Sequence, residues 1–193
     1  MTMNIDKTFI GIVIILLSAG CSEELFSLDF SVNDSGEVSS SAEVSLEKFN
    51  DKVVGHGWKC VSFRDVKDNG SLATQEESYR DGWGPSDYYF DESTVTSFFN
   101  VMAWFAACYS TSGYSFEDST VHIGSGNELR LLKLSGGEFT CVSRIGWNYS
   151  GEGEAPIPHY MYFKYKRMTE KELREYREKY TTDYSELLNR TMD

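Results

Sequence analysis

The chain has 193 residues, of which 30 are Asp or Glu and 18 are Lys or Arg, so its formal net charge is −12. Binding to nucleic acid depends on clustered cations that release counterions from the phosphates, and a chain this acidic does not predict such a partner. The length is sufficient for one domain of about 150 residues with a single core, together with shorter flanking segments.

An apolar run stands near the start of the sequence. Residues 9–17 are Phe, Ile, Val or Leu apart from Gly11. This run is shorter than the roughly 20 residues of a membrane-spanning helix and fits the apolar core of a secretory signal. Residues 18–20, which are Ser, Ala and Gly, supply the small side chains of a cleavage site. We therefore expect residues 1–20 to be a signal peptide and Cys21 to begin the mature protein.

The segment Leu16-Leu17-Ser18-Ala19-Gly20-Cys21 resembles a bacterial lipoprotein signal. The resemblance implies that the thiol of Cys21 carries fatty acyl chains such as palmitate and that the membrane is a partner of the protein. One acyl chain binds a bilayer only marginally, whereas two or three chains give a stable anchor. The next residues, Ser22-Glu23-Glu24, resemble an acidic signal for the outer face of the outer membrane. We expect a location on the cell exterior, with the periplasmic face as the alternative.

The segment 21–43 is predicted to be a flexible tether. After Cys21 it contains six carboxylates and no Lys or Arg, and it is rich in Ser. A segment of this composition cannot bury enough apolar surface to order itself, and its like charges repel one another. The folded body is therefore expected to comprise residues 44–193.

The body reads mostly as β-strands. Leu46, Phe49 and Val53 have helical spacing and predict a short entry helix. Residues 72–87 predict a long loop. Residues 98–109 are apolar at both alternating positions and favour a buried strand pair, with a helix as the alternative. Alternation of apolar and polar residues predicts strands at 58–66, 121–123, 129–134, 139–147 and 160–167. Because tight turns rich in Gly and Asn separate these strands, the pattern predicts an antiparallel meander.

The C-terminal region predicts helix. Thr169 and Glu172 have the spacing of a capping box, and Leu173, Tyr176 and Tyr180 then share one helical face. We expect a helix from about Thr169 to Tyr180, with a further turn capped by Asp183, so that the helical region covers about 169–188.

Three segments carry a resemblance to lipocalin-like lipoproteins: Gly55-His56-Gly57-Trp58, Tyr89-Phe90-Asp91-Glu92 and Phe163-Lys164-Tyr165-Lys166-Arg167-Met168-Thr169-Glu170. The resemblance implies a mainly β fold, an up-and-down barrel of about eight strands with a ligand cavity. It also implies that Trp58 closes one end of the barrel and that Arg167 lies across its ring, with Arg144 as the rival.

No catalytic motif is present, so an enzyme is not expected. His56, His122 and His159 stand in no triad or zinc motif, and no cofactor or metal is predicted. The segment Asp65–Glu76 has calcium-loop spacing, but Lys67 occupies a ligand position, so an Asn-Gly hairpin turn is favoured.

Three cysteines, Cys60, Cys108 and Cys141, remain beside Cys21, and their spacing selects no disulfide. We expect all three to be buried free thiols.

Aromatic residues are the main indication of binding. We expect a small apolar or amphipathic ligand inside the barrel. The alternative is a filled barrel that acts as a surface interaction module or glycan binder, with exposed aromatic residues near 79–89. The candidate ligand-binding residues are Trp83, Tyr89, Trp104, Trp147 and Phe163.

Overall fold

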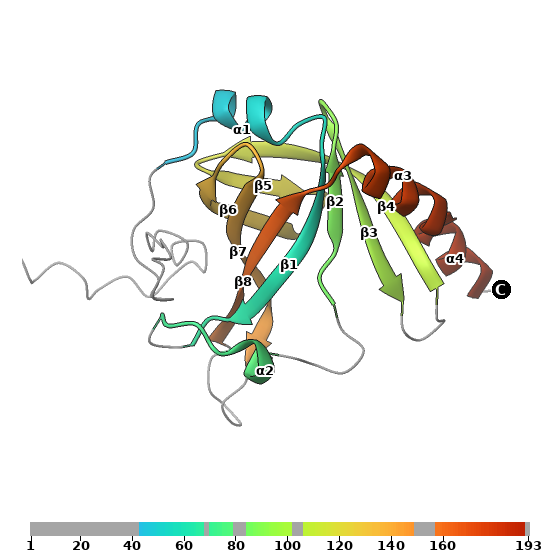
Figure 1. Ribbon diagram of the computed structural model, residues 1–193. Coiled ribbons are helices and arrows are strands. Elements are labelled where there is room, and N and C mark those ends of the chain that lie inside the picture. The colour runs from blue at the N-terminus through green and yellow to red at the C-terminus, as the bar shows by residue number, and fades with distance from the viewer. Residues whose placement is uncertain (1–42, 68–69, 79–83, 102–105, 149–156, 192–193) are drawn as a thin grey trace, which may run out of the picture.

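A computed structural model describes residues 43–67, 70–78, 84–101, 106–148 and 157–191 of the chain. Its centre is a closed barrel of eight strands (Figure 1). The strands are β1 (Gly57–Asp65), β2 (Asp87–Phe90), β3 (Thr94–Val101), β4 (Ala106–Glu117), β5 (Thr120–Ile123), β6 (Asn127–Leu134), β7 (Glu138–Asn148) and β8 (Ile157–Arg167). Each strand pairs antiparallel with the next, and β8 pairs with β1. The predicted up-and-down barrel is confirmed.

The five strands predicted from alternation correspond to β1, β5, β6, β7 and β8, with small shifts at their ends. The apolar segment 98–109 belongs to β3 and β4, as the favoured reading predicted, and residues 102–105 lie outside the described ranges. The segment 72–87 is not only a loop, because it contains the short helix α2 (Gln75–Ser78). A capping box starts that helix. The Thr74 amide donates to the Glu77 carboxylate at 2.7 Å, and the Glu77 amide donates to the Thr74 hydroxyl at 3.1 Å.

The two ends of the barrel differ. At the end that we call the closed end, three short turns join β2 to β3, β4 to β5 and β6 to β7, and helix α1 (Leu46–Lys52) lies over them (Figure 1). The side chain of Ser45 caps α1 by accepting from the Lys48 amide. Phe49 is fully buried and stacks on Phe116 with 4.8 Å between ring centroids. The opposite end, near α2, is called the open end below.

The β4–β5 turn holds the start of the folded body. Asp118 and Ser119 have positive φ values of 46° and 62°, the backbone that a tight hairpin turn requires. The hydroxyl of Ser119 accepts a hydrogen bond of 2.9 Å from the Val44 amide. The chain therefore enters the body at the closed end.

The C-terminal region contains the expected helix that ends near Tyr180 and a further helix capped by Asp183, and a short strand that was not predicted separates them. Helix α3 (Glu170–Lys179) starts at the predicted capping box of Thr169 and Glu172. A two-residue strand, β9 (Thr182–Asp183), then pairs parallel with the part of β4 that β5 does not reach. Asp183 accepts from the Ser185 amide at 2.8 Å and caps α4 (Tyr184–Thr191). None of the helices in the described ranges is long and apolar enough to cross a bilayer.

Helix α3 lies on the outer surface of β1 to β3. The ring of Phe98 contacts Tyr176 and Tyr180 edge-on or tilted, with centroids 5.8 and 5.6 Å apart. Val95 points into the core, and side chains alternate along β3, so Phe98, three positions further on, points outward. Helix α3 thus covers one side of the barrel rather than its open end.

Candidate functional site

Trp58 is the centre of the closed end. Its side chain is 0% exposed, and its ring meets Phe139 edge-on with centroids 4.9 Å apart. The indole N–H donates a hydrogen bond of 3.0 Å to the carbonyl of Val53, at the end of α1. A buried tryptophan needs such an acceptor, so this bond also ties α1 to the barrel.

Arg167 stands directly opposite Trp58 across the β1–β8 pair. Its guanidinium, however, donates to Nδ1 of His56 at 2.7 Å and to the carbonyl of Gly136 at 3.4 Å. The cation–π contacts among the described residues are those of Arg177 with Tyr89 and Lys179 with Tyr180. Arg167 therefore joins the edges of the closed end instead of covering the indole.

The direction of the His56 pKa shift agrees with this bond. Partial burial lowers the pKa of His56, and the neighbouring Arg167 guanidinium acts in the same direction. A neutral ring can accept the proton of Arg167 at Nδ1, whereas a charged ring could not.

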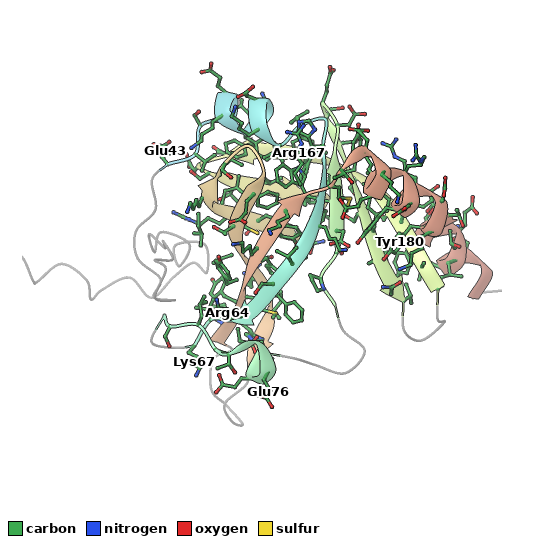
Figure 2. The ribbon with its side chains drawn as sticks, viewed as in Figure 1. Glu43, Arg64, Lys67, Glu76, Arg167 and Tyr180 are labelled. Atoms are coloured by element: carbon green, nitrogen blue, oxygen red, sulfur yellow. The ribbon has the colours of Figure 1, made fainter. Side chains whose placement is uncertain are left out.

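The three sequence segments that carry the lipocalin resemblance meet at this end of the barrel. The amide of Gly55 donates to the carbonyl of Phe90 at 2.8 Å, and the amide of Met168 donates to the carbonyl of Gly57 at 2.8 Å. In Figure 2, Arg167 lies near α1, while Arg64 lies near the other end of β1. The most distinctive sequence positions therefore build the closed end.

The open end contains a cavity of about 410 Å³. It is formed by the segment that leads into β2 and the start of that strand, the β5–β6 turn, the second half of β7 and the middle of β8. The residues that line it are Gly84, Pro85, Ser86, Tyr88, Gly126, Asn127, Leu129, Ser143, Arg144, Ile145, Gly146, Phe163 and Tyr165. This is the candidate binding site of the protein.

The backbone explains why these residues reach the cavity. On β8, Phe163 and Tyr165 are two apart and therefore point to the same, inner face. On β7 the register shifts between Arg144 and Gly146, so that Ile145 is an additional residue in the strand. Such a bulge redirects side chains, and bulges are common beside binding sites.

Aromatic rings and hydroxyl groups share the cavity wall. The rings of Tyr88 and Tyr165 are 5.6 Å apart, and the phenol of Tyr165 donates to the carbonyl of Ser86 at 3.2 Å. Burial raises the pKa of both tyrosines, so both phenols stay neutral. Ser143, only 7% exposed, adds a hydroxyl on β7. The wall thus offers flat aromatic faces together with several neutral hydrogen-bonding groups, and Arg144 also belongs to the lining.

A second polar cluster lies at the open end. Nε2 of His159 is 2.9 Å from Oδ1 of Asp65, and both side chains are largely buried. The nearby hydroxyl of Ser78 accepts from the Asp65 amide and donates to the carbonyl of Thr74, each at 2.8 Å. Because these backbone groups engage the hydroxyl, Ser78 anchors α2 to β1 and is not arranged as a nucleophile.

The structure also places the segment with calcium-loop spacing and the remaining histidine, His122. Lys67 and Ser71 form a hairpin, in which the Lys67 amide donates to the Ser71 carbonyl and the Gly70 amide to the Lys67 carbonyl, each at 2.8 Å. This geometry agrees with the favoured hairpin turn, although residues 68–69 lie outside the description. His122 lies 3.3 Å from Glu128. Within the described ranges, no three His, Cys, Asp or Glu side chains gather in a group that could hold a metal ion.

The cysteines of the body are thiols. Cys108 and Cys141 are buried and Cys60 is partly buried, and all three are free. Burial raises the pKa of Cys60 to about 12 and raises that of Cys141 well above its ordinary value. Thiols held in this form are poor nucleophiles, so these residues serve packing.

The five candidate ligand-binding residues have different places. Phe163 lines the cavity. Tyr89 points outward, since Tyr88 and Phe90 point inward, and the guanidinium of Arg177 lies 4.7 Å from its ring centroid. Trp83 and Trp104 lie outside the described residues, as do Cys21 and the tether; Trp147 belongs to β7, but its side chain is not described.

Sequence reasoning missed most of the cavity wall, including Tyr88, Leu129, Ser143 and Tyr165. Tyr165 could have been found from its alternation with Phe163, which places both on one face. Ser143 carried no signal, because an inward hydroxyl cannot be distinguished from an outward one without the strand register.

Comparison with known proteins adds no relative: no protein-family model matches the chain, and neither a curated protein nor a solved structure is similar to it at a significant level.

Proposed function

We propose that this protein is a lipid-anchored, lipocalin-like lipoprotein that binds a small amphipathic molecule inside its barrel, without catalysis. The observation that carries the proposal is the contrast between the two barrel ends. Trp58 and Phe49 fill the closed end, whereas the open end leads to the cavity of about 410 Å³. A barrel blocked at one end and hollow at the other is the usual arrangement of a carrier.

The chemistry of the wall supports an amphipathic ligand. The volume falls within the range of about 300–1,000 Å³ that is typical of small-molecule sites. The rings of Phe163, Tyr88 and Tyr165 suit an apolar or planar group, and Ser143 with the Ser86 backbone suits a neutral polar group.

The proposed anchor rests on the sequence around Cys21. In the proposed arrangement the acyl chains hold residue 21 in the membrane and the tether leads to Val44, which is bound at the closed end by Ser119. The open end then lies at the side of the barrel away from the point where the tether enters. We propose the outer membrane as the location.

The alternative function is a surface glycan binder with exposed aromatic residues. Of the aromatic residues near 79–89, the structure describes Tyr88, which lies in the cavity wall, and Tyr89, whose ring carries the guanidinium of Arg177 on one face; Tyr79 and Trp83 lie outside the described residues. Neither described ring is fully open to a sugar. This favours the interior site.

Two measurements test the interior site. The Cys21→Ala chain, purified without organic solvent, should carry a co-purified small molecule in native mass spectrometry. It should also bind a dansyl-labelled fatty acid with enhanced fluorescence. The Ser143→Leu variant places an isobutyl group in the cavity and should weaken binding of this probe. The matched control Ser115→Leu makes the same change on an exposed position of β4 and should bind as the parent does.

Equal binding by both variants would contradict an interior site and favour a surface one. Because an inserted side chain can disturb folding, the Ser143→Ala variant is included: it removes the hydroxyl without adding volume. If Ser143→Ala and Ser115→Leu bind while a folded Ser143→Leu does not, the loss comes from the filled cavity.

A further inference from the structure

The positive charges of the barrel are confined to one half of it. Within the described strands, every Lys and Arg belongs to β1, β6, β7 or β8, and β2 to β5 contain none. These four strands are neighbours in the sheet, in the order β1-β8-β7-β6. The distribution is unexpected in a chain whose net charge is −12.

The strand register brings seven of these side chains together on the outer surface. Lys59 pairs with Lys166, Lys164 lies opposite Thr140, and Thr140 lies opposite Lys133. These side chains alternate with the inward ones of the core. Arg144 pairs with the outward Tyr160 and also borders the cavity beside the β7 bulge. We call this surface the basic face, and its members are Lys59, Arg64, Arg130, Lys133, Arg144, Lys164 and Lys166.

Few carboxylates balance the basic face. On the same surface of these four strands stand Glu128 and Glu138, and Glu138 forms an ion pair of 2.9 Å with Lys164. Asp65 belongs to β1 but points inward to His159. On these four strands, seven cations face two carboxylates, and Asp87 of β2 and Glu172 of α3 add negative charge near Lys59. The positive charges still outnumber the negative ones on this face.

The shape of the array indicates the kind of anion that it suits. Neighbouring strands lie about 4.8 Å apart, and outward residues of one strand recur about every 7 Å, so the cations form a two-dimensional grid. A single linear polymer would match a row of charges better than a grid. Val61, which is 46% exposed at the β1 bulge, adds an apolar side chain beside the cations. On the same side of the strands, Tyr162 is buried and packs with Leu132 and Val142.

We propose that the basic face docks the barrel onto an anionic membrane surface. The proposal rests on the lipid anchor proposed above, because an acyl group and a basic surface together bind a bilayer much more firmly than either alone. Anionic headgroups attract Lys and Arg only within about a Debye length, near 8 to 10 Å, so the face must approach the headgroups closely. The barrel then lies on its side, with the β8 strand toward the membrane.

The test measures vesicle binding by the Cys21→Ala chain, so that no acyl group contributes. The first variant combines Lys59→Gln, Lys133→Gln and Lys166→Gln, three exposed residues of the basic face. The control combines Lys48→Gln, Lys171→Gln and Arg174→Gln, which are equally exposed on α1 and α3 and change the net charge equally. Vesicles consist of phosphatidylcholine alone or of phosphatidylcholine mixed with phosphatidylglycerol.

We expect the parent chain and the control to bind the mixed vesicles and to release them as salt is raised. The basic-face variant should bind roughly 10- to 100-fold more weakly. Equal losses in the variant and the control would overturn the proposal, as would equal binding of the parent to neutral vesicles. Preferential binding of the parent to soluble dextran sulfate over the mixed vesicles would overturn it in favour of a polysaccharide partner.

These outcomes are independent of the cavity and of Cys21. A failure of the basic face leaves the dansyl fatty acid binding of the interior site unchanged. Conversely, a protein whose Cys21 carries no lipid would still show the vesicle binding measured here.

Discussion

The phenol of Tyr176 on α3 donates a hydrogen bond of 2.8 Å to Oδ2 of Asp87, the first residue of β2. The other carboxylate oxygen of Asp87 accepts from the amide of Cys60 on β1. The residue before Asp87, Ser86, accepts from the cavity phenol of Tyr165. Asp87 thus connects the C-terminal helix, two barrel strands and the rim of the cavity.

Removal of this bond should destabilise the protein. We expect Tyr176→Phe to lower the free energy of unfolding by about 1–3 kcal/mol, because a partly buried carboxylate loses one of its two donors. Urea denaturation measures the change. The control Tyr114→Phe removes a phenol that donates to the carbonyl of Asp91 at the exposed β2–β3 turn, and it should cost less. An equal loss of unfolding free energy in both variants would show that the Tyr176–Asp87 hydrogen bond contributes no more than the exposed one.

Asp87 should also contribute a recognisable pH dependence. Burial raises the pKa of Asp87 above its ordinary value of 3.8, and the hydrogen bonds from Cys60 and Tyr176 only partly oppose this. A raised folded-state pKa means that the protonated carboxyl is favoured in the folded protein. Its stabilising contribution is complete below the unfolded pKa and is lost as the pH rises through the folded pKa.

The stability of the parent relative to Asp87→Asn should therefore fall as the pH rises above 3.8, until Asp87 is ionised in the folded state. Urea denaturation of both proteins across this pH range measures the difference. A difference that rose with pH would mean that the hydrogen bonds outweigh burial and that the folded-state pKa is lowered.

Gly57 allows α3 to approach the barrel. A Cβ atom at this position would lie 2.9 Å from both Cδ1 of Leu173 and Sδ of Met168. We expect Gly57→Ala to lower the free energy of unfolding by about 1–3 kcal/mol, because the neighbours must move apart. Gly137→Ala is the control, since nothing lies within 4 Å of its added Cβ. Thermal denaturation should show a lower midpoint for the first variant and little change for the second.

Cys21 should decide membrane attachment. The Cys21→Ala variant is expected to leave the detergent-extractable membrane fraction, because no acyl group can be attached to alanine. Fractionation at high salt distinguishes the anchor from the weaker binding of the basic face, which salt screens. Parent protein labelled with an alkyne fatty acid should carry the label, and the variant should not. A variant that still sediments with membranes at high salt would exclude Cys21 as the attachment point.

Local features of the fold could be predicted from the sequence alone. The capping box of Thr169 and Glu172 was recognisable because both partners lie within one helical turn. The strands from 121 to 167 were recognisable because alternation and turn residues are encoded by neighbouring positions. Since short antiparallel hairpins follow one another, the meander also followed from local order.

The tertiary structure alone decided which side chains share a site. The bulge after Cys60 and the bulge at Ile145 shift the alternation, and no periodic pattern shows where such an extra residue falls. The division of the C-terminal region at β9 depended on an unpaired part of β4, which is distant in sequence. The basic face arose in the same way, because barrel closure places β1 beside β8, and only that pairing brings Lys59 next to Lys166.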